Sequence, residues 1–247
     1  MTLVPKVIHF IYPVWENTRP LSYVNYVAVA LARKHHPDYT IKFWVSGTPV
    51  QNENWDKIQQ LVEIHPFESP THWKGIKIQW PQYSSDIARL QILDHEGGIY
   101  MDTDMLCLKP LDNLIGNKLI MSWEDQSMKS ISNAMILSPP NNNFLKIWLG
   151  GIGDAMKGVW AEGGVVLPAT IWDNGTDYLR QDSDIILPKN FCPLDLSRKW
   201  LFDPYYANTA EALSKDSYAI HVFETYWRDI IKDITPEWCN AIDCLFS

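Results

Sequence analysis

Long apolar runs are missing from this sequence of 247 residues. No stretch approaches the roughly 18 apolar residues that a membrane-spanning helix needs, so the sequence predicts no transmembrane segment. The N-terminus, Met1 to Lys6, also lacks the long apolar core and the small-residue cleavage site of a signal peptide. From these features we expect a cytoplasmic protein.

Positive charge is scarce as well. The chain has 21 Lys and Arg against 29 Asp and Glu, a formal net charge of −8. A protein that binds mainly nucleic acid needs a basic face, so we expect no nucleic-acid partner. A diphosphate ligand would need a metal ion or local Arg and Lys residues. The four cysteines, Cys107, Cys192, Cys239 and Cys244, show no zinc-binding spacing and are expected to be reduced thiols.

Apolar residues, at 46%, are abundant enough for a sizeable core. Strand-like and helix-like segments alternate, which predicts βαβ units and a largely parallel sheet in one α/β domain. The expected strands cover residues 6–12, 39–45, 76–80, 119–123, 132–137, 185–187 and 218–222. The expected helices cover residues 21–34, 55–64, 84–96, 144–155 and 230–246, with a loop from residue 162.

An Asp-x-Asp motif, Asp102-Thr103-Asp104, follows a glycine pair and the short apolar segment 99–101. Alternate residues of an extended chain point the same way, so both carboxylates are expected to converge at the strand end. Carboxylate oxygens are ligands that Mg²⁺ and Mn²⁺ accept, and a cation held there could bind a diphosphate.

The motif by itself is weak, because a chain with 19 Asp among 247 residues contains Asp-x-Asp about 1.5 times by chance. A second copy, Asp182-Ser183-Asp184, follows a polar segment with no strand before it. We interpret that copy as a solvated turn, so the context of Asp102 and Asp104 is what singles them out.

The helix expected at residues 84–96 carries a charged pair on its inner side. Ser84, Ser85 or Asp86 would open the helix as N-cap. On a helical wheel Asp86 and Arg89 lie beside Leu90 and Leu93, on the core-facing side. An ordinary ion pair between positions i and i+3 is the plain alternative to a functional role.

Five segments carry a pattern known from one family: residues 5–11, 85–93, 97–104, 132–136 and 219–227. Together they resemble the DXD-containing glycosyltransferases of the mannosyltransferase and capsular-polysaccharide type, whose core is similar to that of clostridial glucosylating toxins. The run from Ser85 to Asp104 is the most specific part of this resemblance, and the segment at 219–227 is less specific.

The resemblance implies a GT-A fold, one α/β domain with a mixed central sheet that binds a nucleotide sugar at its strand ends. It implies a single catalytic domain over residues 1–247, with a nucleotide-binding half at 1–110 and an acceptor-side half and closing C-terminal segment at 111–247. The implied enzyme is a metal-dependent hexosyltransferase of polysaccharide biosynthesis that uses Mn²⁺ or Mg²⁺. It would move a sugar, with retention, from a UDP- or GDP-linked donor to a glycan or other hydroxyl acceptor.

The resemblance also implies roles for individual residues. The expected catalytic group is Asp86, Arg89, Asp102 and Asp104. The expected metal ligands are Asp102, Asp104 and His221. The expected donor-binding residues are Ile11, Tyr12, Ser85, Tyr100, Asn133 and Trp227. Within these sets, Ile11 and Tyr12 would line the base pocket, Asp86 and Arg89 would hold sugar hydroxyls, and Trp227 would close over the phosphates.

Two other functions remain open at this stage. A sugar-binding module without catalysis could use the same residues. A phosphatase of the haloacid dehalogenase type also places Asp-x-Asp after a strand, but on its first strand, whereas about 100 residues precede the motif here.

Overall fold

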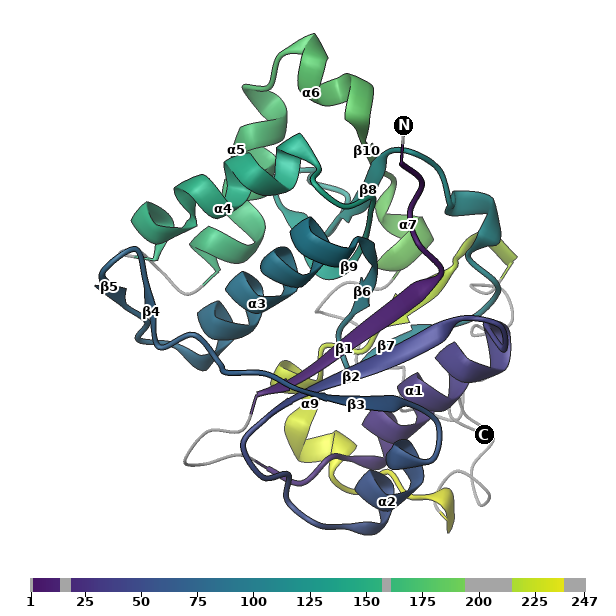
Figure 1. Ribbon diagram of the computed structural model, residues 1–247. Coiled ribbons are helices and arrows are strands. Elements are labelled where there is room, and N and C mark those ends of the chain that lie inside the picture. The colour runs from purple at the N-terminus through teal and green to yellow at the C-terminus, as the bar shows by residue number, and fades with distance from the viewer. Residues whose placement is uncertain (1, 14–18, 157–160, 194–214, 238–247) are drawn as a thin grey trace.

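The computed structural model describes residues 2–13, 19–156, 161–193 and 215–237, and it confirms the predicted α/β class (Figure 1). A mixed seven-stranded sheet has the order β10-β8-β9-β6-β1-β2-β3. Its strands are β1 (Val7–Pro13), β2 (Thr40–Ser46), β3 (Glu63–Pro66), β6 (Gly98–Met101), β8 (Leu119–Trp123), β9 (Ile131–Ser138) and β10 (Ser183–Ile186). β9 is antiparallel to β6 and β8, and the other neighbours in the sheet are parallel.

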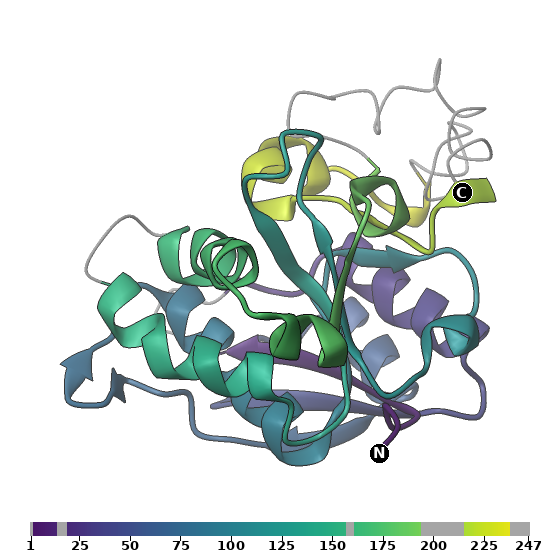
Figure 2. The same ribbon diagram turned by 90° about the horizontal axis from the view of Figure 1, so that it is seen from above.

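Helices cover both faces of this sheet (Figures 1 and 2). The helices are α1 (Tyr23–His35), α2 (Glu53–Gln59), α3 (Pro81–Glu96), α4 (Asn143–Ala155), α5 (Leu167–Asp173), α6 (Asp177–Asp182), α7 (Pro188–Phe191) and α9 (Glu224–Ile231), with a 3-10 turn η1 (Asp112–Leu114) and a π-helical turn η2 (Glu162–Val166). Within the described parts of the chain, none of them combines the length and the apolar composition that crossing a bilayer requires.

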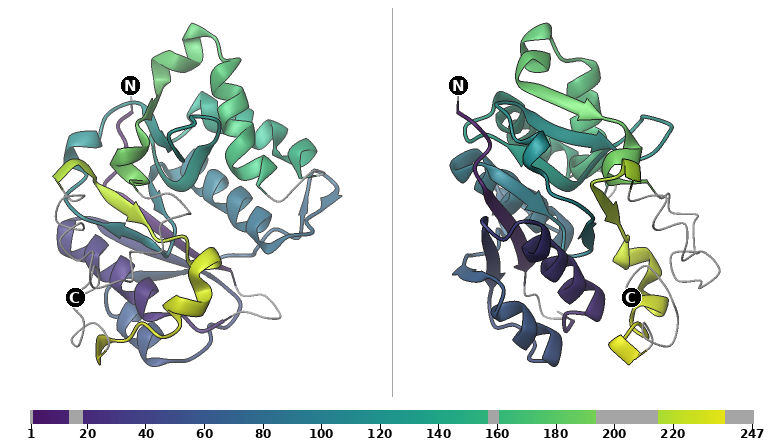
Figure 3. Two further views of the ribbon diagram at one scale, coloured as in Figure 1. Left: turned by 180° about the vertical axis from the view of Figure 1, so that it is seen from behind. Right: turned by 90° about the vertical axis from the view of Figure 1, so that its right-hand side faces the viewer.

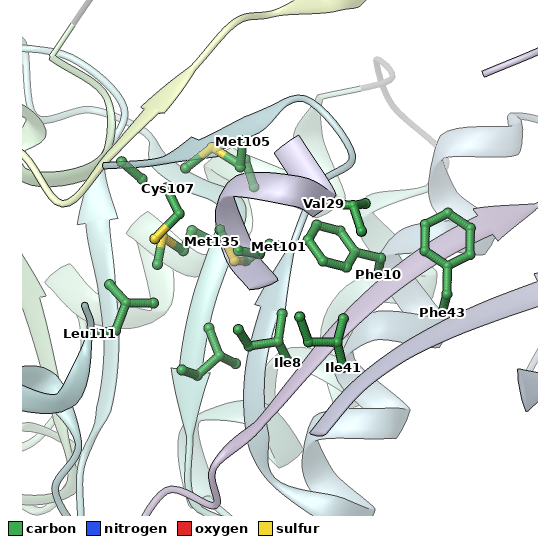
Figure 4. Packing of buried hydrophobic residues seen from close by; sticks show 14 of the residues in the cluster. Ile8, Phe10, Val29, Ile41, Phe43, Met101, Met105, Cys107, Leu111 and Met135 are labelled. Carbon is green, nitrogen blue, oxygen red and sulfur yellow. The ribbon is translucent and has the colours of Figure 1, made fainter. Parts of the chain in front are cut away.

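The central strand β1 is apolar on both sides because both sides are buried. Ile8 and Phe10 face a cluster that includes residues of α1 and α2, and Ile11 faces a second cluster formed with α3 and α4. Figure 4 shows Ile8 and Phe10 packed beside Ile41 and Phe43 of β2, in the first cluster. A strand covered on both faces is expected to be an almost continuous apolar run, as this one is.

A small antiparallel sheet of β7 (Met105–Cys107) and β11 (Ala219–His221) connects the end of the chain to its middle (Figure 3). Leu106 and Ile220 pack against Val24 and Ala28 of α1 in a third apolar cluster. This packing places His221, the last residue of β11, next to the segment that follows β6. Among the cysteines, Cys107 and Cys192 are free and buried, whereas Cys239 and Cys244 lie outside the described residues.

Two predicted elements are wrong in type or in place. Helix α2 ends at Gln59, and part of the segment predicted to extend it forms the edge strand β3, which pairs with the free edge of β2. Only Ile76–Lys77 of the predicted strand at 76–80 is extended, as β5, and it pairs with β4 (His72–Trp73) outside the central sheet. Lys74 and Gly75, with φ of 48° and 81°, form the hairpin turn.

Several element boundaries also differ from the predictions. Helix α3 begins at Pro81, because proline fits the first helical position, and not at residues 84–86. The loop predicted from residue 162 is the π-helical turn η2. The helix predicted at 230–246 is displaced, since α9 covers Glu224–Ile231, and residues 238–246 lie outside the described residues.

Candidate active site

The connection between α3 and β6 depends on two glycines. Gly97 and Gly98 have φ of 68° and 109°, in the region that side chains disfavour. A Cβ on Gly98 would lie 2.7 Å from the carbonyl oxygen of Val7, and a Cβ on Gly97 would lie 2.6 Å from Cδ of Pro140. Glycine at both positions therefore lets α3 turn directly into β6, the strand that leads to the Asp-x-Asp motif.

The two carboxylates of the motif converge through a turn and not through extended chain. Strand β6 ends at Met101, and the amide of Met105 donates to the carbonyl oxygen of Asp102 at 3.0 Å. The amide of Asp102 donates to Ala134 of β9 at 2.8 Å, which fixes the first residue of the turn. The expected alternation along a strand is thus the wrong reason for the convergence of Asp102 and Asp104.

Arg89 is buried among groups of the protein itself, with 5% of its surface exposed. Its Nη2 lies 3.2 Å from Oδ1 of Asp86, and its Nη1 lies 3.2 Å from Oδ1 of Asp102. Nη1 also donates to the carbonyl oxygen of Asn133 at 2.7 Å. The guanidinium lies over the ring of Tyr100, 4.4 Å from its centroid. Arg89 therefore links α3, the Asp-x-Asp turn and β9.

Tyr100 and Asn133 complete the hydrogen bonding of the two carboxylates that Arg89 joins. The Tyr100 hydroxyl donates to Oδ1 of Asp102 in a short hydrogen bond. Nδ2 of Asn133 donates to Oδ1 of Asp86 at 2.8 Å. The backbone of Gly164 in η2 lies against this pair, since a Cβ there would be 2.8 Å from both Oδ2 of Asp86 and Nδ2 of Asn133.

The C-terminal segment contacts Asp104 at three points. Nε2 of His221 lies 3.5 Å from its Oδ1, and the amide of Glu224 donates to its Oδ2 at 2.7 Å. The amide of Val222 donates to its carbonyl oxygen at 3.1 Å. Asp102, Asp104 and His221 each offer one ligand atom, and these atoms lie within 4.8 Å of one another.

Burial and neighbouring charges set the protonation of this group. Burial raises the pKa of Asp86 to about 6, although Arg89 opposes the shift, and burial also raises the pKa of Asp102. Burial would raise the pKa of Asp104 too, but His221 lowers it below the usual value. Burial would lower the pKa of His221, but the Asp104 carboxylate raises it well above its usual range. Asp104 and His221 therefore stabilise each other as an ion pair.

Four of the residues expected at the site make other contacts in the structure, and their roles at the site stay predictions. Ile11 and Tyr12 pack into the two apolar cores, where the Tyr12 ring lies 6.4 Å from those of Phe43 and Trp55. Ser85 contributes its carbonyl oxygen, which accepts from Nε of Arg89 at 3.3 Å. Trp227 packs against the cluster of α1, β7 and β11.

The second Asp-x-Asp copy is not a turn, contrary to the prediction. Asp182 ends helix α6, and Asp184 lies in β10, which pairs in parallel with β8. Asp182 accepts from Nδ2 of Asn143 at 2.9 Å, and Asp184 pairs with Lys118 at 3.1 Å. These contacts give both carboxylates structural roles at the edge of the sheet.

Three contributors to the site were not among the predicted site residues: Asn25, Gly164 and Glu224. Asn25 had a visible signal, because it is a polar residue among the apolar positions of the predicted helix at 21–34. Glu224 lies in the segment 219–227 that carries the family pattern, whereas Gly164 reaches the site only through a tertiary contact.

The chain resembles known glycosyltransferases in sequence and in fold. Residues 24–138 match the family described as "Glycosyltransferase sugar-binding region containing DXD motif". The fold is similar to that of the solved structure "PaToxG Glycosyltransferase", with a TM-score of 0.50 and 17% identity over 99% of this chain and 85% of that one. These findings confirm the predicted resemblance to the DXD-containing glycosyltransferases and the GT-A fold.

Curated relatives point the same way. The chain is 25% identical to "Glucan organizing enzyme 1" of Cryptococcus neoformans var. grubii, over 95% of this chain and 66% of the relative. It is 28% identical to "Inositol phosphoceramide mannosyltransferase 1" of Schizosaccharomyces pombe, over 59% of this chain and 41% of the relative. The chain thus spans less than two thirds of the length of either relative.

Proposed function

We propose that this protein is a metal-dependent glycosyltransferase that moves a sugar from a nucleoside-diphosphate sugar to a hydroxyl group of a glycan or other acceptor, with retention. The observation that carries the proposal is the convergence of Asp102, Asp104 and His221 beside the buried Asp86–Arg89 pair. The division into a nucleotide-binding half at residues 1–110 and an acceptor-side half at 111–247 stays a prediction, as does a cytoplasmic location.

The three converging side chains fit a divalent cation such as Mn²⁺ or Mg²⁺. They supply two carboxylates and one imidazole within 4.8 Å of one another, a donor set of hard oxygens and one nitrogen. Nε2 of His221 faces Oδ1 of Asp104 at 3.5 Å, and a cation would take the place of the proton between them, because an imidazole binds a metal only in its neutral form. A cation bound there would offset the negative charge that develops on a departing nucleoside diphosphate.

The surrounding residues support orientation of the donor. Arg89 holds Asp86 and Asp102 in fixed positions, so their outer oxygens can accept hydrogen bonds from sugar hydroxyls. Asn133 directs the Asp86 carboxylate from the other side. We assign no protein nucleophile, because retention by departure and attack on the same face needs none.

A donor assay identifies which sugar and which nucleotide the protein uses. Because one relative is named as a mannosyltransferase, a mannose donor is the first candidate. The experiment incubates the protein with Mn²⁺ and UDP-glucose, UDP-galactose or GDP-mannose, and measures released nucleoside diphosphate. We expect Asp104→Asn to abolish release with the active donor and Asp184→Asn to leave it unchanged. The proposal is wrong if folded Asp104→Asn retains full release. Donor binding without any release by the wild type would indicate a sugar-binding module.

A further inference from the structure

Asn25 is a buried amide in α1, with 4% of its surface exposed. Its Oδ1 accepts from the amide of Ser22 at 2.7 Å. Its Nδ2 donates to the carbonyl oxygen of Thr103 at 3.1 Å and to Oε2 of Glu224 at 2.8 Å. Leaving a buried donor without a partner is unfavourable, so these contacts hold the side chain and its acceptors together.

The two acceptors of Nδ2 belong to segments that build the site from opposite ends of the chain. Thr103 is the middle residue of the Asp-x-Asp turn, and Glu224 begins α9 directly after the segment that carries His221. The amide of Glu224 also donates to Oδ2 of Asp104 at 2.7 Å. Asn25, Thr103, Asp104 and Glu224 thus form a closed ring, joined by hydrogen bonds and by the peptide bond between residues 103 and 104.

The segment that Asn25 supports contains a strained residue. Phe223 has φ of 56° and ψ of 49°, a left-handed conformation that residues with a side chain disfavour. Hydrogen bonds from its two neighbours, Val222 and Glu224, to Asp104 hold it there. Such a conformation persists only where the surroundings fix it, and the Asn25–Glu224 hydrogen bond is part of those surroundings.

We propose that Asn25 is a positioning residue of the active site. It fixes the Asp-x-Asp turn against the segment 221–224, so that Asp102, Asp104 and His221 converge before any ligand binds. The inference rests on the proposed metal site and goes beyond it, since Asn25 bonds to none of the three ligand side chains and acts through Thr103 and Glu224. Residues that orient metal ligands in this way typically change metal affinity by roughly 10- to 100-fold when replaced.

The test replaces the amide with a carboxylate of the same shape. Asn25→Asp exchanges the Nδ2 donor for an oxygen that faces two acceptors, Thr103 and Glu224. Asn25→Ser removes the same donor without adding charge. The matched control is Asn142→Asp, because Asn142 is also 4% exposed and caps α4, and its Nδ2 donates to the carbonyl oxygen of Asp182 at 3.0 Å.

Two measurements on the full chain decide the outcome: Mn²⁺ binding by calorimetry without nucleotide, and hydrogen exchange of the amides of Val222 and Glu224. We expect both Asn25 variants to bind Mn²⁺ at least roughly tenfold more weakly and to exchange these amides faster. Asn142→Asp should change neither the Mn²⁺ affinity nor the exchange of these amides, even if its melting temperature falls as far as that of the Asn25 variants. Adding Glu224→Gln to Asn25→Asp supplies a new donor across the ring and should recover part of both losses.

The inference and the proposed metal site can fail separately. Unchanged exchange and unchanged Mn²⁺ affinity in a folded Asn25 variant would overturn the positioning role. If the wild type binds no Mn²⁺ and the Asn25 variants still exchange faster at Val222 and Glu224, the metal site is wrong and the positioning role stands.

Discussion

Replacing Gly164 with alanine tests how closely the backbone of η2 shapes the active site. The added Cβ would lie 2.8 Å from Oδ2 of Asp86 and from Nδ2 of Asn133, whereas ordinary contact begins at 3.4 Å. These atoms must therefore move by about 0.6 Å, because overlap inside the van der Waals distance is strongly repulsive. The movement would disturb the contacts of Asp86 with Asn133, at 2.8 Å, and with Arg89, at 3.2 Å.

The magnitude follows from the sensitivity of catalysis to geometry. A misplacement of about 1 Å can cost a factor of about 100 in rate, so we expect Gly164→Ala to lower kcat/KM roughly tenfold, or about 1.4 kcal/mol of transition-state stabilisation. Overpacking costs about 1–3 kcal/mol of stability, partly offset by the gain of about 0.5–1 kcal/mol when alanine replaces glycine in a helix. The protein should therefore remain folded.

Gly150→Ala is the matched control for this substitution. Gly150 lies inside α4, and a Cβ there would meet nothing within 4 Å. We expect unchanged kcat/KM and an equal or higher melting temperature, since the substitution only improves helix propensity. Steady-state release of nucleoside diphosphate from the active donor and thermal unfolding are measured on both variants. Wild-type kcat/KM in folded Gly164→Ala would refute the reasoning.

Three further substitutions test the charges of the structure. Burial lowers the pKa of His9 to about 4, so the neutral form favours the folded state, and this stability is lost as pH falls from about 6.5 towards 4. In urea unfolding, the free energy of unfolding of the wild type should fall by about 2 kcal/mol between pH 7.5 and pH 5 because of His9, and His9→Gln should not show this fall. An equal fall in both proteins would contradict the prediction. Arg89→Lys keeps the charge but not the planar fork, so transfer should fall roughly 100-fold while calorimetry shows nearly normal nucleoside diphosphate binding. A parallel loss of both would indicate that Arg89 is a phosphate ligand or part of a structural ion pair instead. His221→Ala should weaken Mn²⁺ binding in folded protein, and unchanged affinity would exclude His221 as a ligand.

The sequence by itself predicted the parts of the fold that depend on local pattern. β1 is a nearly continuous apolar run because it lies between two helical layers, and this run marks the position of the strand in the sequence. The glycine pair marked the end of α3 and the start of β6 because both residues need positive φ. The helical wheel also placed Asp86 and Arg89 on the inner face, where the structure buries them.

Strands that form only because a neighbouring strand is free to pair with them could not be predicted from the local sequence. The helix predicted at 55–64 overlaps the start of segment 63–66, yet this segment forms β3 because the edge of β2 is free to pair with it. The strand predicted at 76–80 does not join the central sheet, and Ile76–Lys77 instead form one strand of a small hairpin. Local propensity is a weak preference, and the hydrogen bonds of a sheet edge outweigh it.

In the candidate site, too, some features were visible in the sequence and others depend on the fold. The motif and the strand position of His221 were visible in the sequence, but tertiary structure decided how they meet. A turn and not a strand brings Asp102 and Asp104 together, and Arg89 contacts Asp102 and other groups of the protein rather than facing solvent. Asn25 and Glu224 enter only because the fold brings together segments 199 residues apart. The sequence shows Asn25 as a polar break in the predicted helix at 21–34, but it does not show the partners of Asn25, since these contacts exist only in the folded chain.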